Sequence, residues 1–299
     1  MPKRKLISFD WAIKRLLRSK ANFDVLEGFL SVLLNDDIII IEMLESETNK
    51  DDKNDKFNRV DLKVKNQKAE IILVEIQYDR ELDYFQRILY ATSKAVTEHL
   101  FEGETYQKAI KVISINILYF NLGEGDDYVY YGKTCFTGLH KHDELCLTQT
   151  QQALFNKKKP EDIFPEYYLI RVNKFNDIAR NSLDEWVYFL KNEEINDSFQ
   201  AKGLRRAKEI LDVMKLPETE RAAYERYLED KRYQASMFQS TYVAGLFEGK
   251  QEGRQEGIRE GIRDGIQKGI QEGEIKKARE AIQSASLAHF VTLMAQTAE

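Results

Sequence analysis

Residues 57–77 read FNRVDLKVKNQKAEIILVEIQ, and this stretch decides the fold. Two runs of alternating apolar and polar residues, 57–65 and 70–77, flank the turn sequence Asn66-Gln67-Lys68. Alternation with a period of two is typical of strands, and a short polar turn between two such runs is typical of an antiparallel hairpin. We therefore predict a β-hairpin here and assign the other elements around it.

The polar faces of the two hairpin strands carry the candidate functional residues. In the first strand Asp61 and Lys63 lie on the face opposite the apolar residues, because successive side chains alternate. In the second strand Glu75 and Gln77 take the corresponding face. If the turn centres on residues 67–68, Asp61 lies opposite residue 74 or 75. The Asp61 and Glu75 side chains are then within about 5–6 Å of each other.

Two interpretations of this acidic pair are open. Two carboxylates at that separation repel each other unless a cation lies between them. Mg²⁺ takes oxygen ligands of this kind and keeps several waters, which suits phosphodiester cleavage. The alternative is a solvated strand face on which the acids pair with Lys63 and Lys65, and the pattern alone favours this more ordinary arrangement.

The flanking sequence predicts helices on both sides of a mixed sheet. Apolar residues at steps of three and four indicate two short helices in 8–35 and another helix at 84–100. Further strands are predicted at 38–44, 110–120, 128–136 and 167–172, and the chain is helical almost throughout from residue 183. This order of elements predicts an α/β fold with helices on the faces of a mixed sheet.

The C-terminal tail has one internal repeat. Glycine occupies every fourth position from Gly245 to Gly273. A period of four drifts by about 40° per step around an α-helix, and each interior glycine costs up to about 1 kcal/mol relative to alanine. The tail is either a close-packed oligomerisation helix or a mobile, charge-balanced linker, and the sequence supports both equally.

Composition excludes several classes of protein. The net charge of −5 argues against a protein that coats nucleic acid through bulk positive charge. Two cysteines, Cys135 and Cys146, are too few for a disulfide framework or a four-thiolate zinc site. Because no run approaches the ~20 apolar residues of a membrane helix and no signal-peptide pattern follows the start, we expect a cytoplasmic protein with no membrane partner.

One pattern in the sequence resembles the PD-(D/E)XK nuclease superfamily. It consists of a helical start, then Asp61, and then, after thirteen intervening residues, Glu75-Ile76-Gln77. More narrowly, several blocks resemble the recombination-promoting nuclease and transposase (Rpn) family. These are Phe9-Asp10 with 14–17, 29–35, Glu47, 59–61, 74–77, Arg87, Tyr90, 93–95, 103–106 and 112–118. The resemblance spans about residues 8–190, and the glycine-spaced tail is also similar to tails in that family.

This resemblance implies a domain organisation and a metal site. It implies a restriction-endonuclease-like core in 1–195, followed by a helical region in 196–240 and the glycine-repeat tail in 241–299. Asp61, Glu75 and the backbone carbonyl of Ile76 are expected to hold Mg²⁺, for which Mn²⁺ is an expected substitute. Glu47 is expected to be a further ligand of this metal or the anchor of a second metal.

Gln77 stands where the superfamily usually has lysine. Glutamine can orient a water but brings no positive charge, so we expect Lys63, on the same face, or a second metal to supply it. Arg87 and Tyr90, one turn apart on the following helix, are expected to brace Glu75 or to meet a DNA phosphate. A surface arginine and a core tyrosine without a role in the site are the equally favoured alternative.

The resulting functional hypothesis is a Mg²⁺-dependent DNA endonuclease associated with recombination or mobile elements. DNA is the expected partner, together with a homo-oligomer formed through the tail. The alternative hypothesis is a catalytically inactive protein that keeps the nuclease fold as a DNA-binding or oligomeric scaffold.

Overall fold

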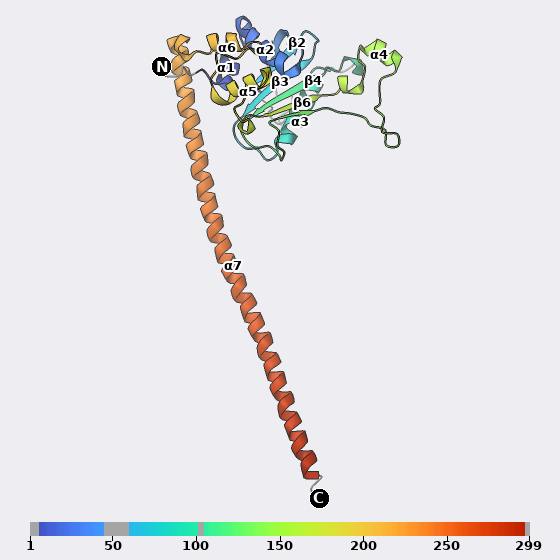
Figure 1. Ribbon diagram of the computed structural model, residues 1–299, viewed down its shortest axis with the longest axis vertical. Coiled ribbons are helices and arrows are strands. Elements are labelled where there is room, and N and C mark those ends of the chain that lie inside the picture. The colour runs from blue at the N-terminus through green and yellow to red at the C-terminus, as the bar shows by residue number, and fades with distance from the viewer. Residues whose placement is uncertain (1–5, 45–59, 101–104, 297–299) are drawn as a thin grey trace. The chain divides into compact units, whose positions relative to one another are not determined.

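The centre of the fold is a six-stranded mixed sheet (Figure 1). The computed structural model describes residues 6–44, 60–100 and 105–296. The strands are β1 (Ile40–Leu44), β2 (Leu62–Asn66), β3 (Ile71–Gln77), β4 (Val112–Leu118), β5 (Val129–Gly132) and β6 (Glu166–Arg171). In the order β1-β2-β3-β4-β6-β5, the pairs β3–β4 and β4–β6 are parallel and the others antiparallel. The predicted α/β mixed sheet is confirmed.

The hairpin that decides the fold is formed by β2 and β3. Leu62 lies opposite Val74, and Lys65 lies opposite Ile71. The Asn66 side chain closes the turn, because its Oδ1 accepts hydrogen bonds from the backbone N–H groups of Lys68, at 3.0 Å, and Glu70, at 2.9 Å.

The connection from β3 to its parallel neighbour β4 runs through α3 (Tyr84–Thr97). Parallel strands require such a crossover, and the helix buries one face of the sheet. Ala91 and Ala95 of α3 pack with Leu73 of β3 and Val112 of β4 in one hydrophobic cluster. The face of the hairpin that carries Leu73, and by alternation Glu75, is therefore covered by α3.

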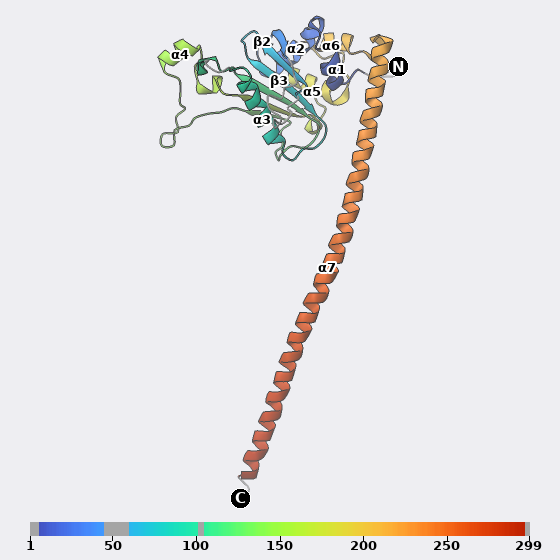
Figure 2. The ribbon, with the colours of Figure 1, turned by 180° about the vertical axis from the view of Figure 1, so that it is seen from behind.

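Four further helices of the N-terminal unit gather on the side of the sheet away from α3 (Figures 1 and 2). They are α1 (Phe9–Arg15), α2 (Phe23–Leu34), α5 (Ser182–Asn192) and α6 (Leu204–Ile210). An aromatic cluster joins three of them, with ring centroids 5.5 Å apart for Phe9 and Phe29 and 5.4 Å apart for Phe29 and Trp186. This cluster fixes the position of α1, which contributes a side chain to the candidate site described below.

The remaining elements are short, apart from the last helix. The helix α4 (Gln149–Phe155) was not predicted from the sequence and begins with a capping box formed by Thr148 and Gln151. Short 3-10 helices occur at Lys20–Asn22, Tyr106–Lys108, Pro160–Asp162, Val172–Lys174 and Val213–Lys215. No helix among the residues that the structure describes has both the length and the apolar character needed to cross a membrane.

The chain divides into two compact units, Met1–Tyr224 and Glu225–Glu299. The first unit includes α6 and the start of α7 (Glu218–Gln296), so residues 196–224 belong to the same compact unit as the sheet. The second unit is the continuation of α7, which is helical through all eight repeat glycines. Ile258, Ile262, Ile266 and Ile270 are exposed on it.

Candidate functional site

Asp61 and Glu75 meet at the end of the β2–β3 hairpin. Leu62 is paired with Val74, so one further step of the antiparallel register sets Asp61 across from Glu75. The Asp61 Oδ2 accepts a hydrogen bond of 2.8 Å from the backbone N–H of Ile76. The carboxylate of Asp61, directly before the first residue of β2, therefore takes the place of a strand partner for Ile76.

Glu75 is a buried carboxylate with one satisfied oxygen. Its side chain is 12% exposed, and its Oε1 is paired with Arg87 of α3. Its Oε2 is buried and has no hydrogen-bond partner among the described residues. Burial, and then the negative charge of Asp61, raise the pKa of Glu75 to about 8, although Arg87 opposes the shift.

A cation fits this arrangement. Leaving a carboxylate oxygen buried and unpartnered is costly, and a hard divalent ion takes oxygen ligands of this kind. The N–H and C=O of one strand residue point to the same side of the strand. The Ile76 N–H bonds to Asp61, so the Ile76 carbonyl also points to the Asp61 side, past the residue at which β2 begins. Asp61, Glu75 and the Ile76 carbonyl thus present oxygens around one place.

Lys14 of α1 also reaches the acidic pair, from a part of the chain distant in sequence. Its Nζ lies 3.0 Å from Asp61 Oδ1 and 2.6 Å from Asp10 Oδ1. Burial lowers the pKa of Lys14, but the charges of Asp10 and Asp61 outweigh this and raise it. Arg18, just after α1, donates to the backbone carbonyl of Asp61 at 2.9 Å. The end of α1 therefore holds Asp61 by both its carboxylate and its backbone.

Sequence reasoning did not assign this role to Lys14. The Asp10–Lys14 pair is visible in the sequence as an acid and a base four residues apart on a helix. Its contact with Asp61, however, depends on how α1 packs against the hairpin.

Gln77 and Arg87 are joined through Glu81. The Gln77 Nε2 donates to Glu81 Oε1 at 2.8 Å, and the same oxygen is 2.5 Å from Arg87 Nη1. Arg87 also forms an ion pair with Glu75, which is the contact that a brace on Glu75 requires. Tyr90 lies one turn further along α3 and is 36% exposed. Glu47 lies outside the described residues.

Lys63 has a different partner from the one expected. Lys63 is a residue of β2, lies opposite Leu73 of β3 and is 8% exposed. It forms an ion pair of 2.7 Å with Glu98, which follows the last residue of α3. The structure therefore brings Lys14, not Lys63, into ion-pair contact with Asp61.

A family model described as PD-(D/E)XK nuclease family transposase matches residues 7–240. The chain belongs to this family. No curated protein and no solved structure gives a significant match to it. The matched residues of this PD-(D/E)XK family member include the whole sheet and all the described site residues. Membership indicates a nuclease-related function, and nucleases of this type typically use divalent metals.

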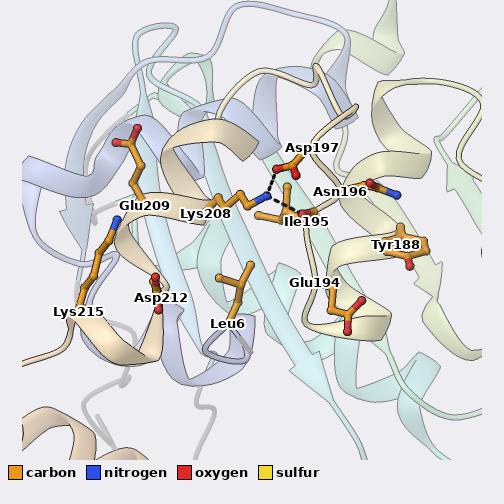
Figure 3. Close-up of a pocket in the computed structure, with 10 residues that line it drawn as sticks. All are labelled: Leu6, Tyr188, Glu194, Ile195, Asn196, Asp197, Lys208, Glu209, Asp212 and Lys215. Atoms are coloured by element: carbon orange, nitrogen blue, oxygen red, sulfur yellow. Dashed lines mark hydrogen bonds and ion pairs between the residues drawn. The ribbon is translucent and has the colours of Figure 1, made fainter. Parts of the chain in front are cut away.

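The Asp61–Glu75 pair is separate from a cavity in the same unit. A cavity of about 500 Å³ opens among residues of α5, α6 and their connections, including Tyr188, Glu194 and Lys208 (Figure 3). Lys208 donates there to the Ile195 carbonyl at 3.1 Å and is paired with Asp197. None of the lining residues lies on a strand of the sheet, so this cavity is not part of the acidic site.

Proposed function

We propose that this protein is a Mg²⁺-dependent DNA endonuclease whose metal ligands are Asp61, Glu75 and the Ile76 carbonyl, with Mn²⁺ as a substitute ion. The observation that carries the proposal is the Oε2 of Glu75, which is buried beside Asp61 and has no hydrogen-bond partner in the part of the chain that the structure describes. Family membership supports a nuclease, and the resemblance to the Rpn family connects it to recombination and mobile elements.

The protein residues have distinct tasks in this proposal. Asp61 and Glu75 hold the metal, and Arg87 fixes the orientation of Glu75 through their ion pair. Bound Mg²⁺ would activate a water for attack on the phosphate and neutralise the charge that builds up there. Gln77 keeps its side-chain oxygen available to orient a water, because its amide nitrogen donates to Glu81.

Lys14 supplies the positive charge that Gln77 lacks. It already lies against Asp61, whereas Lys63 is engaged by Glu98. Its side chain is 44% exposed, so it is accessible from solvent. An ammonium group in that position stabilises negative charge on a phosphate in the transition state.

The alternative is a catalytically inactive scaffold that binds DNA or assembles through the tail. Its support is the second unit, a single helix with a row of exposed isoleucines and glycines. We propose that this tail forms a homo-oligomer in either case. Removal of residues 241–299 should then lower the number of subunits per particle, which is the molar mass measured by light scattering divided by the mass of one chain. An unchanged number of subunits would contradict tail-mediated assembly.

Incubation of the purified protein with supercoiled plasmid tests the proposed activity. We expect nicked or linear DNA with Mg²⁺ or Mn²⁺ and intact plasmid with a chelator. Asp61→Ala should abolish cleavage while the circular dichroism spectrum stays that of the wild type.

Glu70→Gln is the matched control variant. Glu70 directly precedes the first residue of β3, whereas Glu75 lies near the last residue of that strand. It should cleave as the wild type does. Cleavage that persists in Asp61→Ala, or that continues in the presence of chelator, would refute the assigned metal site. A wild-type protein that binds DNA without cleaving it would favour the scaffold.

A further inference from the structure

Both cysteines lie on an arm of the N-terminal unit, between β5 and α4 (Figure 1). Thr137 and Glu144 form an isolated antiparallel bridge in this arm. Two backbone hydrogen bonds flank the bridge, from Leu145 N to the Phe136 carbonyl at 2.9 Å and from Gly138 N to the Asp143 carbonyl at 2.8 Å. The arm is therefore a short antiparallel hairpin.

The register of this hairpin, continued by one residue, sets the cysteines across from each other. Residue 137 lies opposite 144, and 136 shares a hydrogen bond with 145. The next step of the same register sets Cys135 across from Cys146, and the paired strands end there because the Leu147 N–H bonds to the Lys158 carbonyl. Directly opposed residues have side chains on the same face. Opposed pairs alternate between hydrogen-bonded and non-hydrogen-bonded. Phe136 shares a hydrogen bond with Leu145, so the continued register makes Cys135 and Cys146 a pair of the non-hydrogen-bonded type.

This type of pair suits a disulfide. The Cα atoms of a non-hydrogen-bonded antiparallel pair are about 4.5 Å apart, and disulfides span Cα separations of about 4.4–6.8 Å. Both cysteines are reduced and exposed, so a small reagent can reach them. Within the described residues, the Cys135 thiol contacts Glu161 Oε2 at 3.6 Å and the Cys146 thiol contacts the Glu144 carbonyl at 3.7 Å, and both contacts are long.

A metal site at the same place is less well supported. Ligand atoms of Cys135, Glu144 and Glu161 lie within 4.8 Å of one another. However, Lys133 lies 2.9 Å from Glu161, and Lys159 lies 2.8 Å from Glu144. The two acids already have protein cations as partners, so they leave no uncompensated charge that would call for a metal.

We propose that Cys135 and Cys146 are a redox-active pair that forms an intramolecular disulfide across the arm when the protein meets a low-molecular-weight disulfide such as oxidised glutathione. The thiolate of one cysteine attacks a sulfur of the oxidised glutathione, forms a mixed disulfide and expels one glutathione thiolate. The thiolate of the other cysteine attacks the protein sulfur of the mixed disulfide and expels the second. The protein loses two protons and two electrons, and the glutathione disulfide is reduced to two thiols.

The test uses the full chain with oxidised glutathione over a range of protein concentrations. We expect both thiols to disappear together, with a mass decrease of two hydrogens, a peptide that links the two cysteines, and a rate independent of protein concentration. Stable adducts carrying glutathione on both cysteines, disulfide-linked dimers, or two thiols that persist would each overturn the proposal.

Variants separate proximity from general reactivity. Cys135→Ser should retain one glutathione on Cys146, because no second thiol can displace it. Combining Leu145→Cys with Cys146→Ser moves the second thiol by one residue to the other face of the arm. This variant should accumulate mixed disulfides, and an internal disulfide that forms in it as fast as in the wild type would contradict the register argument. Neither outcome depends on nuclease activity.

Discussion

Replacing Glu75 with glutamine should stabilise the metal-free protein at alkaline pH while abolishing cleavage. The pKa of Glu75 is raised from 4.5 to about 8, because its carboxylate is buried next to Asp61. Between these pH values the folded protein holds a proton that the unfolded chain has released. The free energy of unfolding of the wild type therefore falls as pH rises through this window and levels off above about pH 8.

The size of the effect follows from this shift. One pKa unit corresponds to about 1.4 kcal/mol, so the two units between about pH 6 and about pH 8 amount to about 3 kcal/mol. Glutamine does not titrate, so the free energy of unfolding of Glu75→Gln does not fall in this way as the pH rises. We expect the stability difference between Glu75→Gln and the wild type to be about 3 kcal/mol larger at about pH 9 than at about pH 6.

Urea unfolding in the presence of chelator measures this difference at both pH values. Asp61→Asn is the matched variant, because it removes the like charge and should reduce the pH dependence without removing Glu75. Added Mg²⁺ should stabilise the wild type more at the higher pH, where Glu75 needs to release no proton to bind it. A stability difference that is the same at both pH values would refute the claim that folding raises the pKa of Glu75.

Three further substitutions probe other contacts. Lys14→Ala should lower the rate of plasmid cleavage about 10²-fold if its charge acts in the transition state, and wild-type rates in this variant would remove Lys14 from the mechanism. Lys63→Ala should lower the free energy of unfolding by about 1–3 kcal/mol, because Glu98 loses its partner, and its cleavage rate should fall much less than that of Lys14→Ala. Gly28→Ala should cost about 1–3 kcal/mol in urea unfolding, because the new Cβ would lie 2.6 Å from the Cα of Gly203; unchanged stability would show that α2 can move away.

The parts of the fold that the sequence predicted are those governed by local periodicity. The alternation in residues 57–77 indicated the hairpin, and the helical spacing of 84–100 indicated α3. The helix α4 was missed because QTQQALF has little apolar periodicity. Its capping pair, Thr148 and Gln151, was the available signal.

The sequence by itself determined that Asp61 and Glu75 share one face of a hairpin, because strand alternation and turn length are local properties of the chain. Only the tertiary structure decided which cations meet them. Lys14 reaches Asp61 because the aromatic cluster fixes α1 beside the hairpin, whereas Lys63 is drawn to Glu98 under the end of α3. These pairings depend on the packing of helices against the sheet, and residue spacing along the chain does not encode that packing.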